Sequence, residues 1–326
     1  FKFDDSVFVN EMKAVVNELR AHITDAWHDF YSVTDAQLFA GTARAKSTQQ
    51  RLQNVANLTK PQLLATFREH YQAQYMTVIY AGPRRHISAL AANLSLIKNS
   101  DASRQVRRPV PAPRIGFTVH IPQTLKNDAG RVQCSFRVNT KWTPRLHAIA
   151  TCAATTLTQG FSSRLYRTLR TQRGLIYAVH SRLEFEVARP EYSYFHIVAK
   201  CTASSIPAVW DCIRHEVTKL ALAGPTACEM RKWRNQRRTV LAALAHLSPK
   251  ELVQQCGWIV HQGHEPVAPN DIAEDALKLT EEELKNFAQQ YLKVENCIVF
   301  HNGNVAPAPA AAQPSTSSEA PVLVRF

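Results

Sequence analysis

The sequence has 326 residues, of which 45% are apolar and 20% charged, so the chain can bury a sizeable core and its composition excludes disorder as its overall state. No run approaches the roughly 18 to 20 apolar residues of a membrane-spanning helix, and charged residues interrupt the opening segment, where a signal peptide would be apolar. We therefore expect neither membrane insertion nor export by a signal peptide. The first residue is Phe1, and we expect a processed or truncated product.

The charge and the cysteines narrow the class of protein further. The 39 Lys and Arg residues exceed the 26 Asp and Glu residues by 13, which favours acidic partners, anionic surfaces or nucleic acid without choosing among them. The seven cysteines form an odd set without a C-x-x-C pair. They predict a reducing compartment, with neither a disulfide framework nor a structural zinc site.

Two segments of the chain repeat one another. The pattern of residues 58–82 recurs 221 residues later in residues 279–303, and a second match relates residues 11–18 to residues 229–236. Thr59 with Gln62, and Thr280 with Glu283, are capping boxes that predict a helix start in each copy. The apolar runs 76–81 and 297–300 then predict one short buried strand in each copy. These matches predict a duplicated domain whose first copy is incomplete in this chain.

The organisation follows from the repeat and from a basic, proline-containing stretch at residues 99–114, which predicts a linker. We expect a first domain over residues 1–98, a second over residues 115–303, and a disordered Ala/Pro/Ser-rich tail over residues 304–326. In the second domain, strands are predicted near 115–121, 131–138, 176–185 and 192–200, and helices near 146–158, 162–171, 206–222, 227–245 and 249–262. This grouping indicates an α+β fold: two homologous domains of helices packed on mixed, largely antiparallel sheets, the first domain incomplete.

Three titratable residues lie along one stripe of the first predicted helix. At 100° per residue, Glu11, Glu18 and His22 fall together at the edge of the apolar arc that contains Met12 and Val16. A carboxylate at the rim of a buried face is partly desolvated and attracts a cation or a metal. The alternative is that Glu18 and His22 form an i,i+4 surface pair that stabilises the helix.

A second candidate lies where a predicted helix turns into a strand. Gly174 fits a left-handed helix cap, so Arg170 and Tyr177 lie on either side of one tight turn. A guanidinium and a phenol placed there can converge on a carbonyl oxygen. The alternative is an arginine favoured at a helix C-terminus and a tyrosine that fills a strand.

Two further patterns have a simpler structural than functional explanation. The basic run 231–238 is compatible with RNA contact, but no aromatic ladder accompanies it, so a solvated helix face is the simpler interpretation. His261 and His264 flank Gly263 in a predicted loop, where two histidines at this spacing share no fixed face for a metal.

The segments "EMKAVVNE" (residues 11–18) and "QGFSSRLYRTLRTQRGLIYAV" (residues 159–179) resemble those of the pitrilysin/insulinase zinc metallopeptidases, a family that includes the mitochondrial processing peptidases and the core subunits of the bc1 complex. The resemblance covers the chain from Phe3 to Gly303. It implies that Glu18 is a zinc ligand with Glu11 as its supporting carboxylate. It also implies that Arg170 and Tyr177 bind the substrate backbone and the tetrahedral intermediate.

The sequence departs from the family at the metal site, because no H-x-x-E-H motif is present among its thirteen histidines. One interpretation is a zinc metalloendopeptidase whose upstream motif lies outside this chain, so that the zinc site here is incomplete. The alternative is a non-catalytic structural or regulatory subunit of a mitochondrial assembly, with a basic surface for RNA or anionic partners. The expected partners are a peptide substrate or a homologous subunit in a dimer or larger assembly, and the expected location is the matrix side of the mitochondrion.

Overall fold

The structure is a computed structural model that describes residues 4–23, 28–97, 113–121, 128–187, 189–302 and 323–324. The chain divides into a first unit, Phe1–Pro111 with Ser248–Gly257, and a second unit, Ala112–Leu247 with Trp258–Phe326. Most of the predicted linker and tail lies outside the described residues. In the described part, no helix combines the length and apolarity needed to cross a bilayer.

The described part of the first unit is helical. Helix α1 packs against α3. The apolar stripe of α1 is half-buried, and it includes Met12, Val16 and Leu19. Ser47 caps α3 by accepting a hydrogen bond from the Gln50 backbone N–H at 3.2 Å. The main helices are α1 (Asp5–Ile23), α2 (His28–Leu38), α3 (Thr48–Ala56), α4 (Lys60–His70) and α5 (Ile87–Ser95).

One predicted strand of this unit is wrong. Residues 76–81 are extended but form no strand, and Met76, Val78 and Tyr80 are exposed. A strand needs a hydrogen-bonded neighbour, and the first unit contains no strand among its described residues. The equivalent segment of the second copy forms strand β5 (Ile298–His301) because β1 (Phe117–His120) and β2 (Ala129–Arg137) pair with it on either side.

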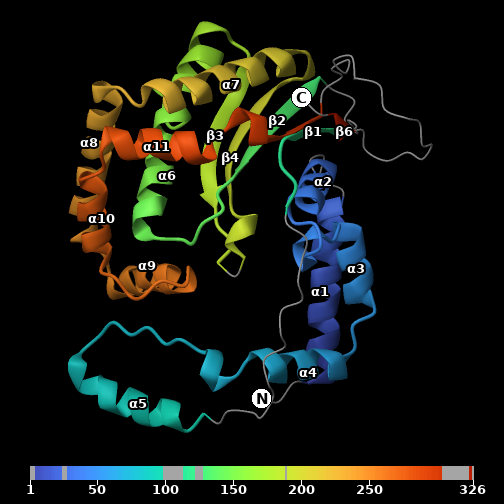
Figure 1. The fold of residues 1–326 in the computed structure, drawn as a ribbon. Helices are drawn as coiled ribbons and strands as arrows, with labels where there is room; N and C mark the ends of the chain where they lie inside the picture. Colours follow the sequence, from blue (N-terminus) through green and yellow to red (C-terminus); the bar gives the residue numbers. More distant parts are fainter. Residues whose placement is uncertain are drawn as a thin grey trace. The chain divides into compact units, whose positions relative to one another are not determined.

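The second unit is built on one mixed sheet (Figure 1). Its strand order is β3-β4-β2-β5-β1-β6, with β3 (Ile176–Glu184), β4 (Tyr194–Thr202) and β6 (Leu323–Val324) completing the set. The β1–β5 pair is parallel and the other neighbours are antiparallel. The predicted α+β class and the largely antiparallel sheet of this unit are confirmed.

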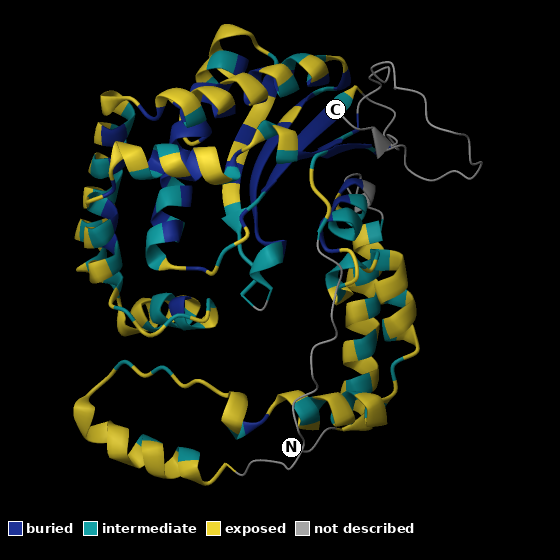
Figure 2. Ribbon diagram, viewed as in Figure 1, coloured by how far each residue is buried: buried dark blue, intermediate teal, exposed yellow. Residues whose placement is uncertain are grey.

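Helices pack on this sheet and bury its central strands (Figure 2). Helix α6 contacts β3, α7 contacts β2 and β4, and Phe287 of α11 meets Phe195 of β4 edge to face, with ring centroids 6.0 Å apart. The core combines these strands with residues of α6, α7, α8 and α11. The helices of this unit are α6 (Pro144–Leu157), α7 (Ile206–Ala223), α8 (Ala227–Leu244), α10 (Pro269–Leu277) and α11 (Glu281–Tyr291). Helix α9 (Pro249–His261) is divided between the units, with residues 249–257 in the first and residues 258–261 in the second.

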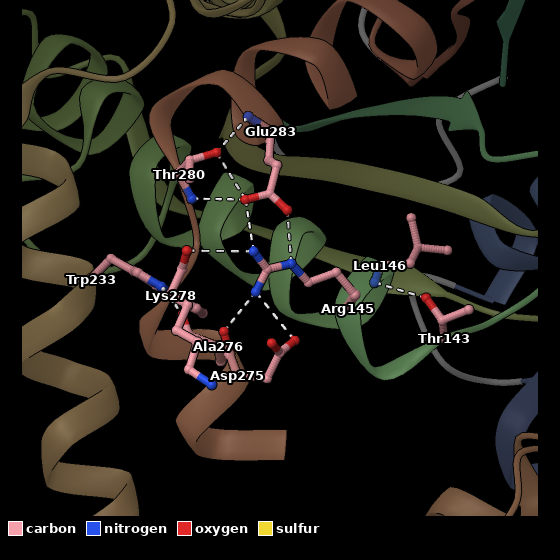
Figure 3. A network of polar contacts seen from close by, with 9 residues as sticks. All are labelled: Thr143, Arg145, Leu146, Trp233, Asp275, Ala276, Lys278, Thr280 and Glu283. Atoms are coloured by element: carbon pink, nitrogen blue, oxygen red, sulfur yellow. Dashed lines mark hydrogen bonds and ion pairs between the residues drawn. The ribbon is translucent and has the colours of Figure 1, made fainter. Parts of the chain in front are cut away.

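Arg145 ties three of these helices together (Figure 3). From the first turn of α6, its Nε and Nη2 donate to the two carboxylate oxygens of Glu283 at 2.8 and 2.7 Å. Its Nη1 donates to the Asp275 carbonyl oxygen at 2.6 Å, at the end of α10. Glu283 also accepts from the Thr280 backbone N–H at 2.9 Å, as the predicted capping box requires. One guanidinium therefore fixes the ends of α10 and α11 against the start of α6.

Arg164 makes a second, more deeply buried connection. Its side chain is 5% exposed, and its Nε and Nη2 donate to Glu229 at 2.7 and 2.8 Å. Nη2 also donates to the Gly224 carbonyl oxygen at 3.0 Å, beyond the end of α7. Glu229 caps α8 by accepting from the Thr226 backbone N–H at 2.7 Å. This bidentate pair anchors the segment that carries Arg170 and Tyr177 to the N-terminus of α8.

We predict that R145A lowers the free energy of unfolding by about 2 kcal/mol, because it removes several charge-assisted hydrogen bonds and leaves two helix-terminal carbonyls without this donor. R214A is the matched control, since Asp211 is the one ion-pair partner of Arg214 among the described residues and both side chains are exposed. Its effect should be within about 0.5 kcal/mol. Urea unfolding of both variants measures the difference, and equal losses would contradict the anchoring role of Arg145.

We predict that E229Q lowers the free energy of unfolding by about 3 kcal/mol at pH 7, because it leaves the buried Arg164 guanidinium without a counter-charge. Burial alone would raise the pKa of Glu229, but hydrogen bonds from Arg164 and Thr226 outweigh it and lower that pKa below its ordinary 4.5. The stabilisation is therefore complete above about pH 4.5 and is lost as the pH falls through the lowered pKa of the folded state.

The measurement is urea unfolding of the wild type, E229Q and the exposed control E282Q from pH 7 to pH 3. The gap between wild type and E229Q should narrow only below about pH 4.5. A gap that stays constant throughout, or an equal loss in E282Q, would show that the ion pair does not act as described.

Candidate functional site

The segment after α6 contains a π-helix where the sequence predicted an α-helix over residues 162–171. After a short helical start at Arg164 and Leu165, the chain forms the π-helix η4 (Tyr166–Gln172). The π-helix is rare and occurs frequently at functional sites, because its wider turn changes the direction of the side chains that follow. Gly174 follows two residues after its end, and its φ of +63° lies in the left-handed region, as the sequence predicted.

Arg170 lies in this π-helix and is fixed to the strand that follows. Its Nη1 donates to the carbonyl oxygen of Ile176 at 2.7 Å, at the start of β3. The backbone closes the same turn, because the Gly174 N–H donates to the Arg170 carbonyl oxygen at 3.2 Å. The predicted helix-to-strand turn therefore exists, and it brings the guanidinium to the backbone beside Tyr177, whose carbonyl oxygen is 3.5 Å from Arg170 Nη1.

Tyr177 lies at an irregularity of the sheet. The register of β3 against β4 shifts between Ile176 and Ala178, which leaves Tyr177 as the extra residue of a β-bulge. A bulge redirects a side chain that regular alternation would place elsewhere, and here Tyr177 and Ala178 are both exposed although they are consecutive. The tyrosine is 68% exposed, so it is not a packed residue of the strand, and that alternative is wrong.

Both side chains have hydrogen-bond donors that make no hydrogen bond to a described residue. Both hydrogen bonds of the Arg170 side chain come from Nη1, which leaves Nε and Nη2 without a partner among the described residues. The Tyr177 hydroxyl likewise has no partner in the described part of the chain. A guanidinium and a phenol O–H that come from the two sides of one turn can both donate to a peptide carbonyl and stabilise negative charge that develops on its oxygen.

Glu11 and Glu18 lie on α1 in the first unit, two turns apart, and both are exposed. Neither makes an ion pair among the described residues, so the predicted i,i+4 pair between Glu18 and His22 is not formed there. Glu11 is the counterpart of Glu229 in the repeat, where the carboxylate is held by Arg164. On α1 no arginine holds the equivalent carboxylate in the described structure.

The described residues do not assemble a zinc site by themselves. No group of three or more His, Cys, Asp or Glu side chains lies close enough together to hold a metal in the part of the chain that the structure describes. Glu18 offers one exposed carboxylate oxygen ligand, and a tetrahedral site needs further ligands from elsewhere. We therefore derive no chemical step through zinc.

Sequence reasoning missed a buried polar chain on the sheet. Ser135 Oγ lies 2.9 Å from His196 Nδ1, and His196 Nε2 lies 3.5 Å from Glu184 Oε2. The order serine, histidine, carboxylate resembles that of a nucleophilic triad. Ser135 is fully buried, however, and His196 nearly so, which denies a substrate access to the hydroxyl. Strand alternation at these positions was the only available signal, and it says nothing about cross-strand contacts.

The remaining predicted patterns have ordinary structural roles. Arg237 in the basic helix stacks on the buried Trp233, 4.5 Å from its ring centroid, and Trp233 Nε1 donates to the Ala276 carbonyl oxygen at 3.0 Å. His261 ends α9, and His264 follows the turn at Gly263, where φ is +74°. RNA contact through α8 stays a prediction.

Comparison with known proteins agrees with this architecture. The family described as "Peptidase M16 inactive domain" matches residues 57–237. An uncharacterized zinc protease of Streptomyces coelicolor is 25% identical over 221 residues, which are 63% of this chain and 45% of that protein. The chain thus spans less than half the length of this curated relative.

Solved structures share the fold. A peptidase M16 inactive domain from Pseudomonas fluorescens superposes with a TM-score of 0.72 at 19% identity, over 92% of this chain and 72% of that one. A protease from Helicobacter pylori gives 0.70 at 16% identity, over 93% and 73%. The periplasmic protease PqqL of Escherichia coli gives 0.68 at 16% identity, over 93% of this chain and 33% of the other. Because the matched family covers more than half of the sequence, the chain belongs to the peptidase M16 family.

Proposed function

We propose that this chain is the substrate-binding part of a zinc metallopeptidase, in which Arg170 and Tyr177 bind the backbone of a peptide and stabilise the oxyanion formed during its hydrolysis. The observation that carries the proposal is the turn itself. A π-helix, a left-handed glycine and a β-bulge lie together there, the Arg170 guanidinium is held at the backbone of Ile176 and Tyr177, and the Tyr177 side chain is exposed. Irregular backbone of this kind is over-represented at functional sites.

The chemistry assigned to the pair is electrostatic. The guanidinium keeps its charge throughout the physiological range, and its unused Nε and Nη2 donors can hold a peptide carbonyl before reaction. The phenol O–H adds a neutral donor at the same place. Donors fixed before reaction stabilise developing negative charge without reorganising, and each such donor is worth roughly a hundredfold in rate.

The zinc chemistry lies outside what this chain supplies. The zinc protease relative supports zinc in the longer family members, and we assign Glu18 as one ligand, with Glu11 as the carboxylate that supports it. The remaining ligands and the general base would come from sequence beyond these residues. Bound zinc would lower the pKa of a coordinated water toward neutrality.

A second candidate is a non-catalytic subunit, favoured by the match to the family's inactive domain. Such a subunit would hold a homologous partner in a larger assembly. A mitochondrial assembly in a reducing compartment remains a proposal that rests on the sequence. The net charge of +13 supports acidic peptides or anionic partners under either candidate.

We predict that R170A weakens binding of an acidic ten-residue peptide to this chain about tenfold or more, because charge-assisted hydrogen bonds to the peptide carbonyl are lost. Y177F should weaken binding less and, in the full-length peptidase, lower kcat by roughly a hundredfold. Isothermal titration calorimetry measures the first effect and peptide hydrolysis the second.

R167A is the matched control, because Arg167 is an exposed arginine of the same π-helix that carries the same charge. R167A removes the same positive charge as R170A but leaves the turn intact. If R167A and R170A weaken binding by the same factor, the effect is one of general charge and the proposed site is wrong. If neither R167A nor R170A changes peptide binding but both variants no longer bind a partner subunit, the non-catalytic subunit is the better interpretation and the peptide-binding proposal is wrong.

A further inference from the structure

A cavity of about 230 Å³ lies in the second unit, away from the turn at Gly174. Its wall is shared by the start of α6, the far end of β3 and the end of α9. The residues that define its chemistry are Trp142, His147, Arg182, Glu184, Trp258 and Gln262. None of them belongs to the site assigned above.

Aromatic rings form most of one wall, and they hold one another in place. The rings of Trp142 and Trp258 meet edge to face, with centroids 5.3 Å apart and an interplanar angle of 85°. His147 meets Trp258 at 4.9 Å, and His264 meets Trp142 at 5.5 Å. Such pairs are the preferred geometry of aromatic contacts, so the wall is formed before any ligand arrives. Trp258 is nevertheless 44% exposed, which leaves ring surface for an occupant.

The charged groups of the cavity compensate one another. Arg182 Nη2 lies 3.2 Å from Glu184 Oε2, so the guanidinium and the carboxylate neutralise each other at the rim. Burial, and then the charge of Arg237, lower the pKa of His147, which keeps this imidazole neutral at pH 7. A cavity without net charge favours an uncharged occupant over a lysine or a glutamate side chain.

One donor in the wall lacks a partner. Trp142 is 5% exposed, and its Nε1–H makes no hydrogen bond to the described residues. A buried donor without an acceptor is costly, and such groups are rare unless a ligand or water satisfies them. The N–H is out of reach of solvent, so the flat ring faces rather than this donor are what the cavity offers, and they suit a ligand that carries a ring.

We propose that this cavity binds the aromatic side chain of a peptide residue, whose ring packs against the rings of Trp142 and Trp258. The inference rests on the proposed function and adds a specificity pocket to it. Strand β3 links the two sites, because Tyr177 lies near its start and Leu183, another wall residue, lies six residues further on. At about 3.3 Å per residue the sites are about 20 Å apart along the strand. One extended peptide can therefore occupy both.

The test uses this chain and three acetylated, amidated ten-residue peptides of Glu, Ser and Gly that differ only in one residue, which is Phe, Ala or Lys. Isothermal titration calorimetry should give about tenfold tighter binding for the Phe peptide than for the Ala peptide, and no gain for Lys. In W258A the Phe preference should fall below about twofold, while the Ala peptide binds as before. F161A is the control, because Phe161 is the most exposed aromatic residue of the described chain and lines no part of the cavity.

A second variant, W142F, keeps an aromatic ring in the wall but reduces the ring surface available for packing. It should weaken binding of the Phe peptide about threefold or more without abolishing its preference over Ala. Equal affinity for Phe and Ala peptides, a preference that survives in W258A, or tighter binding of the Lys peptide would overturn the proposal.

R170A separates this inference from the proposed function. If the proposed function is correct, R170A weakens binding of all three peptides by a common factor and leaves the ratio of Phe to Ala unchanged. A normal ratio with no effect of R170A would refute the proposed role of Arg170 and leave the cavity standing. A strong effect of R170A with no Phe preference would support the proposed role of Arg170 and refute the proposed role of the cavity.

Discussion

The bidentate pair between Arg164 and Glu229 is the constraint on which the arrangement of the candidate site depends. Both ends are tied to backbone as well, because Arg164 also donates to Gly224 and Glu229 accepts from Thr226. The pair thereby joins the residues that precede the π-helix to the N-terminus of α8. A buried guanidinium paired in this way contributes little to stability over an apolar substitute, but it specifies one position for the chain. We infer that the position of Arg170 and Tyr177 follows from it.

The turn between Arg170 and Tyr177 adds three departures from regular structure within twelve residues of the chain, from Tyr166 to Tyr177. The π-helix, the left-handed Gly174 and the bulge each cost some regular hydrogen bonding, and together they expose a phenol that a regular strand would direct elsewhere. The anchor at Arg164 and the buried Leu169 allow the segment to tolerate these departures. The same strand reaches the aromatic cavity at its other end, so both proposed contacts with a peptide depend on how β3 is held.

The sequence was sufficient for the parts of the fold that rest on local patterns. The capping box at Thr280, hydrophobic periodicity and Gly174 place most helices and strands and the turn of the second unit to within a few residues, although α10 was not predicted. It was misleading at 76–81, because a short apolar run does not form a strand without a neighbour to pair with. It could not show the π-helix, the bulge, the Arg145 network or the cavity, since these depend on side chains from distant elements. The same limit applies to the contact between Ser135 and His196, because these residues are far apart in the sequence and no motif spacing connects them.

The most direct test of the central claim is site-specific photocrosslinking of a bound peptide. With p-benzoylphenylalanine in place of Tyr177, the account predicts efficient crosslinking of an acidic decapeptide, lost when Arg170 is also replaced by alanine. The same photocrosslinker in place of Phe161, an exposed aromatic residue of the same segment, should give little product. Equal crosslinking at the two positions, or crosslinking at 177 that is indifferent to Arg170, would contradict the claim that the arginine and the tyrosine form one peptide-binding site.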